Sequence, residues 1–409
     1  MKGLTNSKYI DTIVFTFNTV VQKGALLVLF LIAANMESLG DYGRFSLIRG
    51  NSNLTASFII YVISMSTYKF HTKDKKHNLT NSLESIRFIE NISLIIFSFL
   101  ILISWCCYPS WYFPNTPGIS PLIYTLLFFY LVVKNQGKLS ILIAEIDIKI
   151  IFKYSLISLV LNAVIIIIYL CGFTSIYIAL ACNLLGTYVV LSTILYNRLS
   201  PQSILGFGSY DKEKILDMLA MAKYLLSAAV ISNFLMFFLR NRLYDKVGAE
   251  SLAGFDVLYQ LFNFVGIIGG SVTSSVVSRF ANLDGALPYF YGVSRLLFLI
   301  SSAFIIICFC LGERVLSFFG SGYVDFSQDL FWLSLASLFS AQFYLNDKRL
   351  IGSGEIFKSF LGYGIYTLTA FTTFLVFETS VVSVAYSLLA GFGLAYVYQK
   401  MVFSCARSR

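Results

Sequence analysis

Two matching segments, Ser64-Met-Ser-Thr-Tyr-Lys-Phe70 and Ser274-Ser-Val-Val-Ser-Arg-Phe280, close two long apolar stretches of the sequence at an offset of 210 residues. The same stretches open near Glu37-Ser-Leu39 and Glu250-Ser-Leu252, which are separated by 213 residues. Each match is short, but the nearly constant offset predicts that a unit of six helices is duplicated. Parallel repeats of this kind are typical of transporters in which two helical bundles flank a central cavity.

The composition of the chain is that of a helical membrane protein. Of its 409 residues, 57% are hydrophobic and only 12% are charged, whereas soluble domains carry about 25% charged residues. The mean hydropathy is +0.76. A spanning helix takes roughly 20 residues, so twelve of them leave no room for a separate folded domain. These observations exclude an ordinary soluble enzyme.

Twelve apolar stretches are long enough to cross a bilayer. They fall at 9–34, 45–68, 88–106, 119–143, 154–171, 173–196, 218–239, 253–276, 293–311, 326–345, 357–377 and 380–400. The sequence therefore predicts an all-α polytopic membrane protein of about 12 transmembrane helices, in two repeat-related six-helix bundles around a central cavity. We expect an N-terminal bundle over 1–200, a cytoplasmic linker over 201–217 and a C-terminal bundle over 218–409.

The distribution of basic residues predicts how the chain is oriented. The net charge is +9, from 30 Lys and Arg against 21 Asp and Glu. With both termini in the cytoplasm, roughly 22 basic residues lie on that side and roughly 6 lie outside, as the positive-inside rule requires. Membrane topology therefore explains the surplus of positive charge, and no nucleic-acid partner is expected.

The first span carries one polar face. On a helical projection, an arc of about 160° holds Asp11, Thr12, Thr16, Asn18, Thr19, Gln22 and Lys23. A span surrounded by lipid would leave these polar groups without partners. The pattern therefore favours a helix that turns this face to a water-filled cavity, and polar packing against neighbouring helices is the alternative.

Two lysines lie deep within expected spans. Lys23 belongs to the polar face of the first span, and Lys134 opens the polar break Lys134-Asn-Gln-Gly-Lys138 in the fourth. Because a central Lys costs about 2.5–3.5 kcal/mol to insert, both are candidate substrate-binding residues. For Lys23, the alternative is a structural pair with an acid such as Asp256. For Lys134, the alternative is that the span ends early and the lysine snorkels to the interface.

Four arginines break the positive-inside pattern on the outer side. Arg44 and Arg49 lie in the first turns of the second span, and Arg240 and Arg242 lie at the outer end of the seventh. Together they predict a cationic rim. With the two deep lysines, they predict a substrate-binding cavity suited to an anionic cargo such as phosphate or pyrophosphate.

Residues for metal binding or catalysis are not grouped in this sequence. The seven Cys are scattered without metal-ligand spacing, and the only two His, His71 and His77, share one charged loop. No phosphate-binding loop and no nucleophile elbow occurs. We therefore expect no metal, no cofactor and no catalytic residue. Two acids within the spans, Asp11 and Asp256, are candidates for proton or sodium coupling.

Three features together point to one family of exporters: the polar first span, the turn Leu39-Gly-Asp-Tyr-Gly-Arg-Phe45 with its repeat at 248–255, and the segment 274–280. In these features the chain resembles the bacterial polysaccharide flippases of the multidrug/oligosaccharidyl-lipid/polysaccharide exporter superfamily, and most closely the O-antigen flippases of its polysaccharide transporter family. The resemblance covers the whole chain in length, number of spans and duplication.

The resemblance implies a V-shaped, two-lobed bundle in the bacterial inner membrane. Such a protein moves undecaprenyl-pyrophosphate-linked oligosaccharide for lipopolysaccharide from the cytoplasmic to the periplasmic leaflet by alternating access. A polysaccharide polymerase and a chain-length regulator are the implied partners. Basic residues are implied in the first, second, fourth and seventh spans, where this chain has Lys23, Arg44 or Arg49, Lys134, and Arg240 or Arg242. The eighth span, where such families also carry a basic residue, offers only Asp256 in its interior.

Two other functions remain open at this point. A multidrug-type cation antiporter of the same superfamily would share the architecture, but it needs a prominent acid in its cavity. An O-antigen polymerase or membrane glycosyltransferase would share the hydrophobicity, but it needs a sizeable periplasmic loop for its chemistry. The flippase fits the mostly positive charge of the expected spans best.

Overall fold

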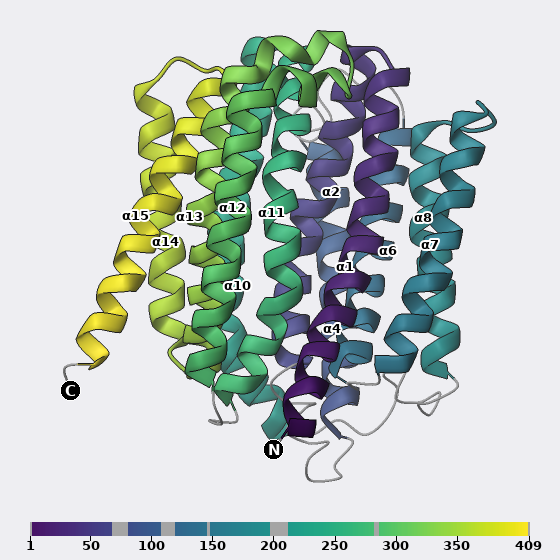
Figure 1. The fold of residues 1–409 in the computed structure, drawn as a ribbon. Helices are drawn as coiled ribbons and strands as arrows, with labels where there is room; N and C mark the ends of the chain where they lie inside the picture. The colour runs from purple at the N-terminus through teal and green to yellow at the C-terminus, as the bar shows by residue number, and fades with distance from the viewer. Residues whose placement is uncertain are drawn as a thin grey trace. The chain divides into compact units, whose positions relative to one another are not determined.

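The computed structural model describes residues 2–67, 81–107, 119–144, 148–196, 212–281 and 286–407. Within these ranges the chain is almost entirely helical and contains no strand (Figure 1). The all-α class predicted from the sequence is therefore confirmed.

Twelve long α-helices follow one another along the described residues. They are α1 (Lys2–Met36), α2 (Leu39–Ser66), α4 (Asn81–Cys107), α6 (Ser120–Ala144), α7 (Ile148–Leu170), α8 (Ile176–Tyr196), α10 (Lys212–Val247), α11 (Ala249–Ala281), α12 (Ala286–Ser317), α13 (Ser327–Gly352), α14 (Ile356–Val376) and α15 (Val381–Arg407). A short 3-10 helix, η2 (Ser321–Phe326), precedes α13. Each expected span falls on one of these helices, in the expected order.

Some helices are longer than the apolar stretches that predicted them. Helix α4 begins at Asn81, a full seven residues before the expected start, and α10 extends from Lys212 to Val247. The last part of the expected linker, from Lys212 onward, is therefore helical. The remainder of that linker, 201–211, lies outside the described residues.

The helices differ in how apolar they are. Eight of the described helices are long and apolar enough to cross a membrane: α4, α6, α7, α8, α10, α12, α14 and α15. Large apolar side chains such as Val160 on α7 and Phe309 on α12 are exposed, as a surface that meets hydrocarbon requires. Helix α13 buries many polar side chains, which include Ser334, Ser337, Ser340, Gln342, Asn346 and Asp347.

The chain forms two compact units that share three helices. The first unit consists of Met1–Ala25 and Leu47–Asn233, and the second of Leu26–Ser46 and Phe234–Arg409. Helices α1, α2 and α10 each contribute to both. The core of the first unit packs Ile48, Ile86 and Phe129 together, whereas the second unit is built on α11, α13 and α15. The six-helix bundles expected over 1–200 and 218–409 remain a prediction.

Two glycines set the close approach of α2, α10 and α11 within the second unit. Gly248 has a φ of +105°, a conformation that favours glycine, and its N–H donates to the carbonyl oxygen of Tyr244 at 3.0 Å. Helix α10 therefore ends there, and α11 begins at Ala249. A Cβ on Gly43 of α2 would lie only 2.2 Å from the Ala249 carbonyl oxygen, so the two backbones touch.

Replacing Gly43 by Ala tests this contact. We expect Gly43→Ala to lower the free energy of unfolding by about 1–3 kcal/mol, because backbone atoms must move apart to admit the methyl group. Thermal unfolding of the detergent-purified protein measures the change. Gly40→Ala on the same helix is the matched control, because nothing lies within 4 Å of a Cβ there. Equal melting temperatures for the two variants would contradict the close approach.

Candidate functional site

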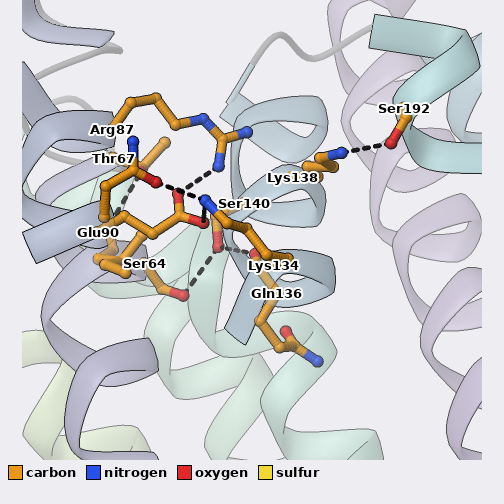
Figure 2. Close-up of polar contacts among 11 residues, drawn as sticks. Ser64, Thr67, Arg87, Glu90, Lys134, Gln136, Lys138, Ser140 and Ser192 are labelled. Carbon is orange, nitrogen blue, oxygen red and sulfur yellow. Dashed lines mark hydrogen bonds and ion pairs between the residues drawn. The ribbon is translucent and has the colours of Figure 1, made fainter. Parts of the chain in front are cut away.

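Four charged side chains form a buried cluster in the first unit, between α4 and α6 (Figure 2). Arg87 and Glu90 lie three residues apart on α4, and Lys134 and Lys138 lie four residues apart on α6. At these spacings both members of each pair occupy one face of their helix. We call these four residues the α4–α6 cluster.

Glu90 is the centre of the cluster. Its carboxylate is fully buried, with 0% exposure, and it forms ion pairs with Lys134 at 3.1 Å and with Arg87. Figure 2 shows the Arg87 and Lys134 side chains converging on this carboxylate. The Lys134 ammonium also donates to Asn91 Oδ1 at 2.6 Å. Arg87 is 2% exposed and Lys134 is 14% exposed, so Lys134 is the less buried of the two cations.

Lys138 is the second lysine of α6; it forms no direct ion pair among the described residues, although Glu90 attracts it electrostatically. Its ammonium donates to the Ser192 hydroxyl of α8 and lies 3.6 Å from the centroid of the Tyr188 ring. A hydroxyl and an aromatic face stabilise a cation without neutralising its charge. The α4–α6 cluster therefore holds three basic side chains against one carboxylate.

A glycine makes room for the cluster. A Cβ on Gly137 of α6 would lie 3.0 Å from Glu90 Oε2 and 3.2 Å from Arg87 Nη1. The backbone of α6 therefore passes directly against the ion pair on α4. Nearby, Ser64 of α2 and Ser140 of α6 share a hydrogen bond of 2.8 Å, so α2 also packs against this part of α6.

A second buried network lies in the second unit and joins α2, α10 and α11. Arg240 Nη1 forms an ion pair with Asp256 Oδ1 at 3.1 Å, and Arg240 Nη2 donates to the backbone oxygen of Ser46 at 2.8 Å. Gln260 Nε2 donates to Asp256 Oδ2 at 2.9 Å and to the Tyr42 hydroxyl oxygen at 2.8 Å. We call these five residues the α2–α10–α11 network.

Comparisons with known proteins identify the fold. No family model matches the chain, and no curated protein matches it. Among solved structures, an outward-facing conformation of a multidrug resistance MATE family transporter of the MOP superfamily is 17% identical over 97% of this chain and 95% of that chain, with a TM-score of 0.72. The chain has the MATE transporter fold.

Two further MATE structures agree with this result. The inward-facing conformation of such a multidrug resistance transporter gives a TM-score of 0.65 at 16% identity, over 97% of this chain and 96% of that chain. MATE in the straight conformation gives 0.68 at 15% identity, over the same shares of the two chains. At these identities the likeness shows the MATE fold, and with it a multi-pass membrane architecture.

In this MATE fold the predicted residues fall in different surroundings. Helix α6 continues past Lys134 to Ala144, and Lys134 forms an ion pair with Glu90 of α4. Lys23 is exposed on α1, and Asp11 lies on α1 with a side chain outside the described part. The acid proposed as a partner for Lys23, Asp256, forms its ion pair with Arg240. A binding role for Lys23 and a coupling role for Asp11 remain predictions.

The four arginines of the predicted rim divide into two pairs. Arg49 and Arg240 are buried. Arg44 is exposed and lies 3.5 Å from Asp41, in a surface pair of small energetic value. Arg242 is exposed and lies over the Phe238 ring at 5.6 Å. The MATE fold thus places Arg240 within a network, whereas a common cationic rim remains a prediction.

Sequence reasoning did not single out Arg87, Glu90 or Lys138 as functional residues. The signal that could have found them is the spacing of Arg87 to Glu90, three residues, at the edge of a long apolar run. Another missed acid is Asp347, buried on α13, which forms an ion pair with Lys348 at 3.2 Å. The hydroxyls of Ser359 and Tyr363 on α14 donate to the same carboxylate.

The α2–α10–α11 network predicts a strong coupling between Arg240 and Asp256. We expect Arg240→Gln to lower the free energy of unfolding by about 3–5 kcal/mol, because it leaves Asp256 buried without its cation. Arg240→Gln combined with Asp256→Asn should recover most of that loss, since no unpaired charge then remains. Thermal unfolding of both variants measures the coupling. Additive losses in the double variant would show that the pair is not the source of the stability.

Proposed function

We propose that this protein is a flippase for undecaprenyl-pyrophosphate-linked O-antigen, or related surface polysaccharide repeat units, in the bacterial inner membrane. It would carry the pyrophosphate-sugar headgroup from the cytoplasmic to the periplasmic leaflet by alternating access, while the lipid tail stays in the bilayer. The α4–α6 cluster is the observation that carries this proposal, because it concentrates positive charge within the spans. The MATE fold supports the transport of a cargo across the membrane.

The balance of buried charge favours an anionic cargo. Among the described side chains of the first unit, three basic residues are buried and Lys134 is nearly so, against a single buried acid, Glu90. In the second unit the two buried acids, Asp256 and Asp347, each have a basic partner. Every buried carboxylate in the described part of the chain is therefore already in an ion pair, whereas Lys138 forms no direct ion pair there.

A diphosphate group fits this arrangement chemically. Ammonium and guanidinium groups donate charge-assisted hydrogen bonds to phosphate oxygens, and such bonds are about twice as strong as neutral ones. Within the bilayer region, where the effective dielectric constant is low, the attraction is larger than it is in water. Lys134 and Lys138 are thus the residues that we assign to the headgroup. A polymerase and a chain-length regulator would act on the delivered repeat unit.

A multidrug-type cation antiporter is the second candidate, because the similar solved structures include multidrug resistance MATE family transporters. That function needs a carboxylate that can hold a cationic drug. Glu90, Asp256 and Asp347 are each already in an ion pair with a basic residue, which disfavours the antiporter function.

Deletion of the gene in its native host tests the proposed function. We expect surface polysaccharide to disappear and lipid-linked repeat units to accumulate on the cytoplasmic side. Lys134→Ala and Lys138→Ala should fail to restore polysaccharide at normal membrane levels, because each removes a cation from the headgroup site. Lys23→Ala tests the remaining deep lysine in the same assay.

Lys149→Ala is the matched control, because Lys149 is exposed at the start of α7. It should restore polysaccharide fully. Intact surface polysaccharide in the deletion strain, together with new sensitivity to cationic drugs, would overturn the flippase proposal in favour of the antiporter. Repeat units that reach the outer leaflet without being extended would indicate a polymerase.

A further inference from the structure

The α4–α6 cluster contains an acid at the point where the proposed function needs positive charge. Glu90 is fully buried and touches both Arg87 and Lys134. An anionic cargo that approaches Lys134 must therefore share that lysine with a carboxylate already in place. Taking charges out of water is costly, so a buried carboxylate at this point calls for an explanation.

Glu90 does not use all the hydrogen-bond donors of the basic residues in the cluster. The Nε and Nη2 atoms of Arg87 are buried without a hydrogen-bond partner among the described residues. Lys138 contacts the Ser192 hydroxyl and the Tyr188 ring, neither of which carries charge, and it interacts with Arg87, Lys134 and Glu90 only electrostatically. With three basic residues and one carboxylate, the cluster retains a surplus of two positive charges.

We propose that Glu90 is an internal counter-ion that competes with the cargo anion for Arg87 and Lys134. In the protein without cargo, Glu90 holds both cations in place. When the cargo anion binds, the negative charge of Glu90 lowers the affinity for that anion, so that the cargo can dissociate again. The surplus of two charges matches a diphosphate diester, which carries two. This inference rests on the proposed function and assigns to Glu90 a specificity-determining role within the same site.

The surrounding residues fit a competing carboxylate. Gly137 lets the backbone of α6 approach within contact distance of the Glu90–Arg87 pair, so the carboxylate lies directly against α6 and contacts its Lys134. The amide oxygen of Asn91 accepts a second hydrogen bond from Lys134. Lys134 therefore keeps one neutral partner when an anion displaces the carboxylate from it.

Two probes of fixed charge test the proposal on the full-length protein. P1,P2-diethyl diphosphate carries two negative charges at neutral pH, and diethyl phosphate carries one. Isothermal titration calorimetry with the detergent-purified chain measures both affinities. Because Coulomb energy scales with the product of the charges, Glu90→Gln should tighten binding of the phosphate about tenfold and of the diphosphate about a hundredfold. Glu84→Gln, which removes an acid in the first turn of α4 outside the cluster, should leave both affinities unchanged.

A second pair of variants keeps the test decisive if Glu90→Gln does not fold. Arg87→Gln alone lowers the surplus charge and should weaken diphosphate binding about a hundredfold. Adding Glu90→Gln to it returns the surplus to that of the natural protein, so affinity should return to within about threefold of the natural value. A carboxylate that merely positions the cations would give no such recovery.

The outcomes separate this inference from the proposed function. If the natural protein binds the diphosphate but Glu90→Gln weakens binding, or if both probes gain equally, the counter-ion role is wrong and the anion site stands. If the double variant binds as weakly as Arg87→Gln, the counter-ion role is likewise wrong. If the natural protein binds neither probe, the anion site itself is overturned, and the counter-ion role falls with it.

Discussion

Hydrocarbon offers no hydrogen-bond partner, and this constraint governs the whole structure. Each spanning segment must satisfy its own backbone, so the described chain is helical nearly throughout. The same constraint acts on hydroxyl side chains. Ser52 donates to the carbonyl oxygen of Ile48, and Thr67 donates to that of Ile63, each one turn back along α2. Charged side chains need a partner of opposite charge, and Glu90 and Asp256 each find one on a neighbouring helix.

Buried polar contacts join several helices within each unit. Helices α2 and α11 supply members of the network around Arg240, and α13 supplies Asp347, whose carboxylate accepts hydrogen bonds from Ser359 and Tyr363 of α14. Arg240 binds Ser46 of α2 and Asp256 of α11 at the same time, which ties three helices with one guanidinium group. In the first unit, Glu90 plays the corresponding part between α4 and α6. Polar contacts of this kind fix which helices become neighbours, whereas apolar packing alone tolerates several arrangements.

The sequence predicted the helices better than it predicted the site. Long apolar runs identify spans directly, and all twelve expected spans fall on helices. Glu90 was not recognised because the apolar run predicted that the third span starts at residue 88, so that Glu90 lay at the edge of the span. Helix α4 begins at Asn81, and Glu90 therefore lies within the helix. Arg240 was expected at the end of its span for the same reason, and α10 continues to Val247. Lys134 was identified from its depth in the expected span. Its partner Glu90 on α4 could not be identified, because hydropathy does not predict which helices pack together.

The sharing of α1, α2 and α10 between the units has a consequence for biogenesis. Neither compact unit is one uninterrupted piece of chain, because residues 26–46 belong with 234–409. When the ribosome has finished the first unit at Asn233, residues 26–46 of α1 and α2 have been made before the rest of the second unit. Tyr42 and Ser46, both buried in the finished protein, must then wait for Arg240 and Asp256 to be synthesised. The contacts of Tyr42 and Ser46 with Arg240 and Asp256 therefore form only after the end of α10 and the start of α11 have been made.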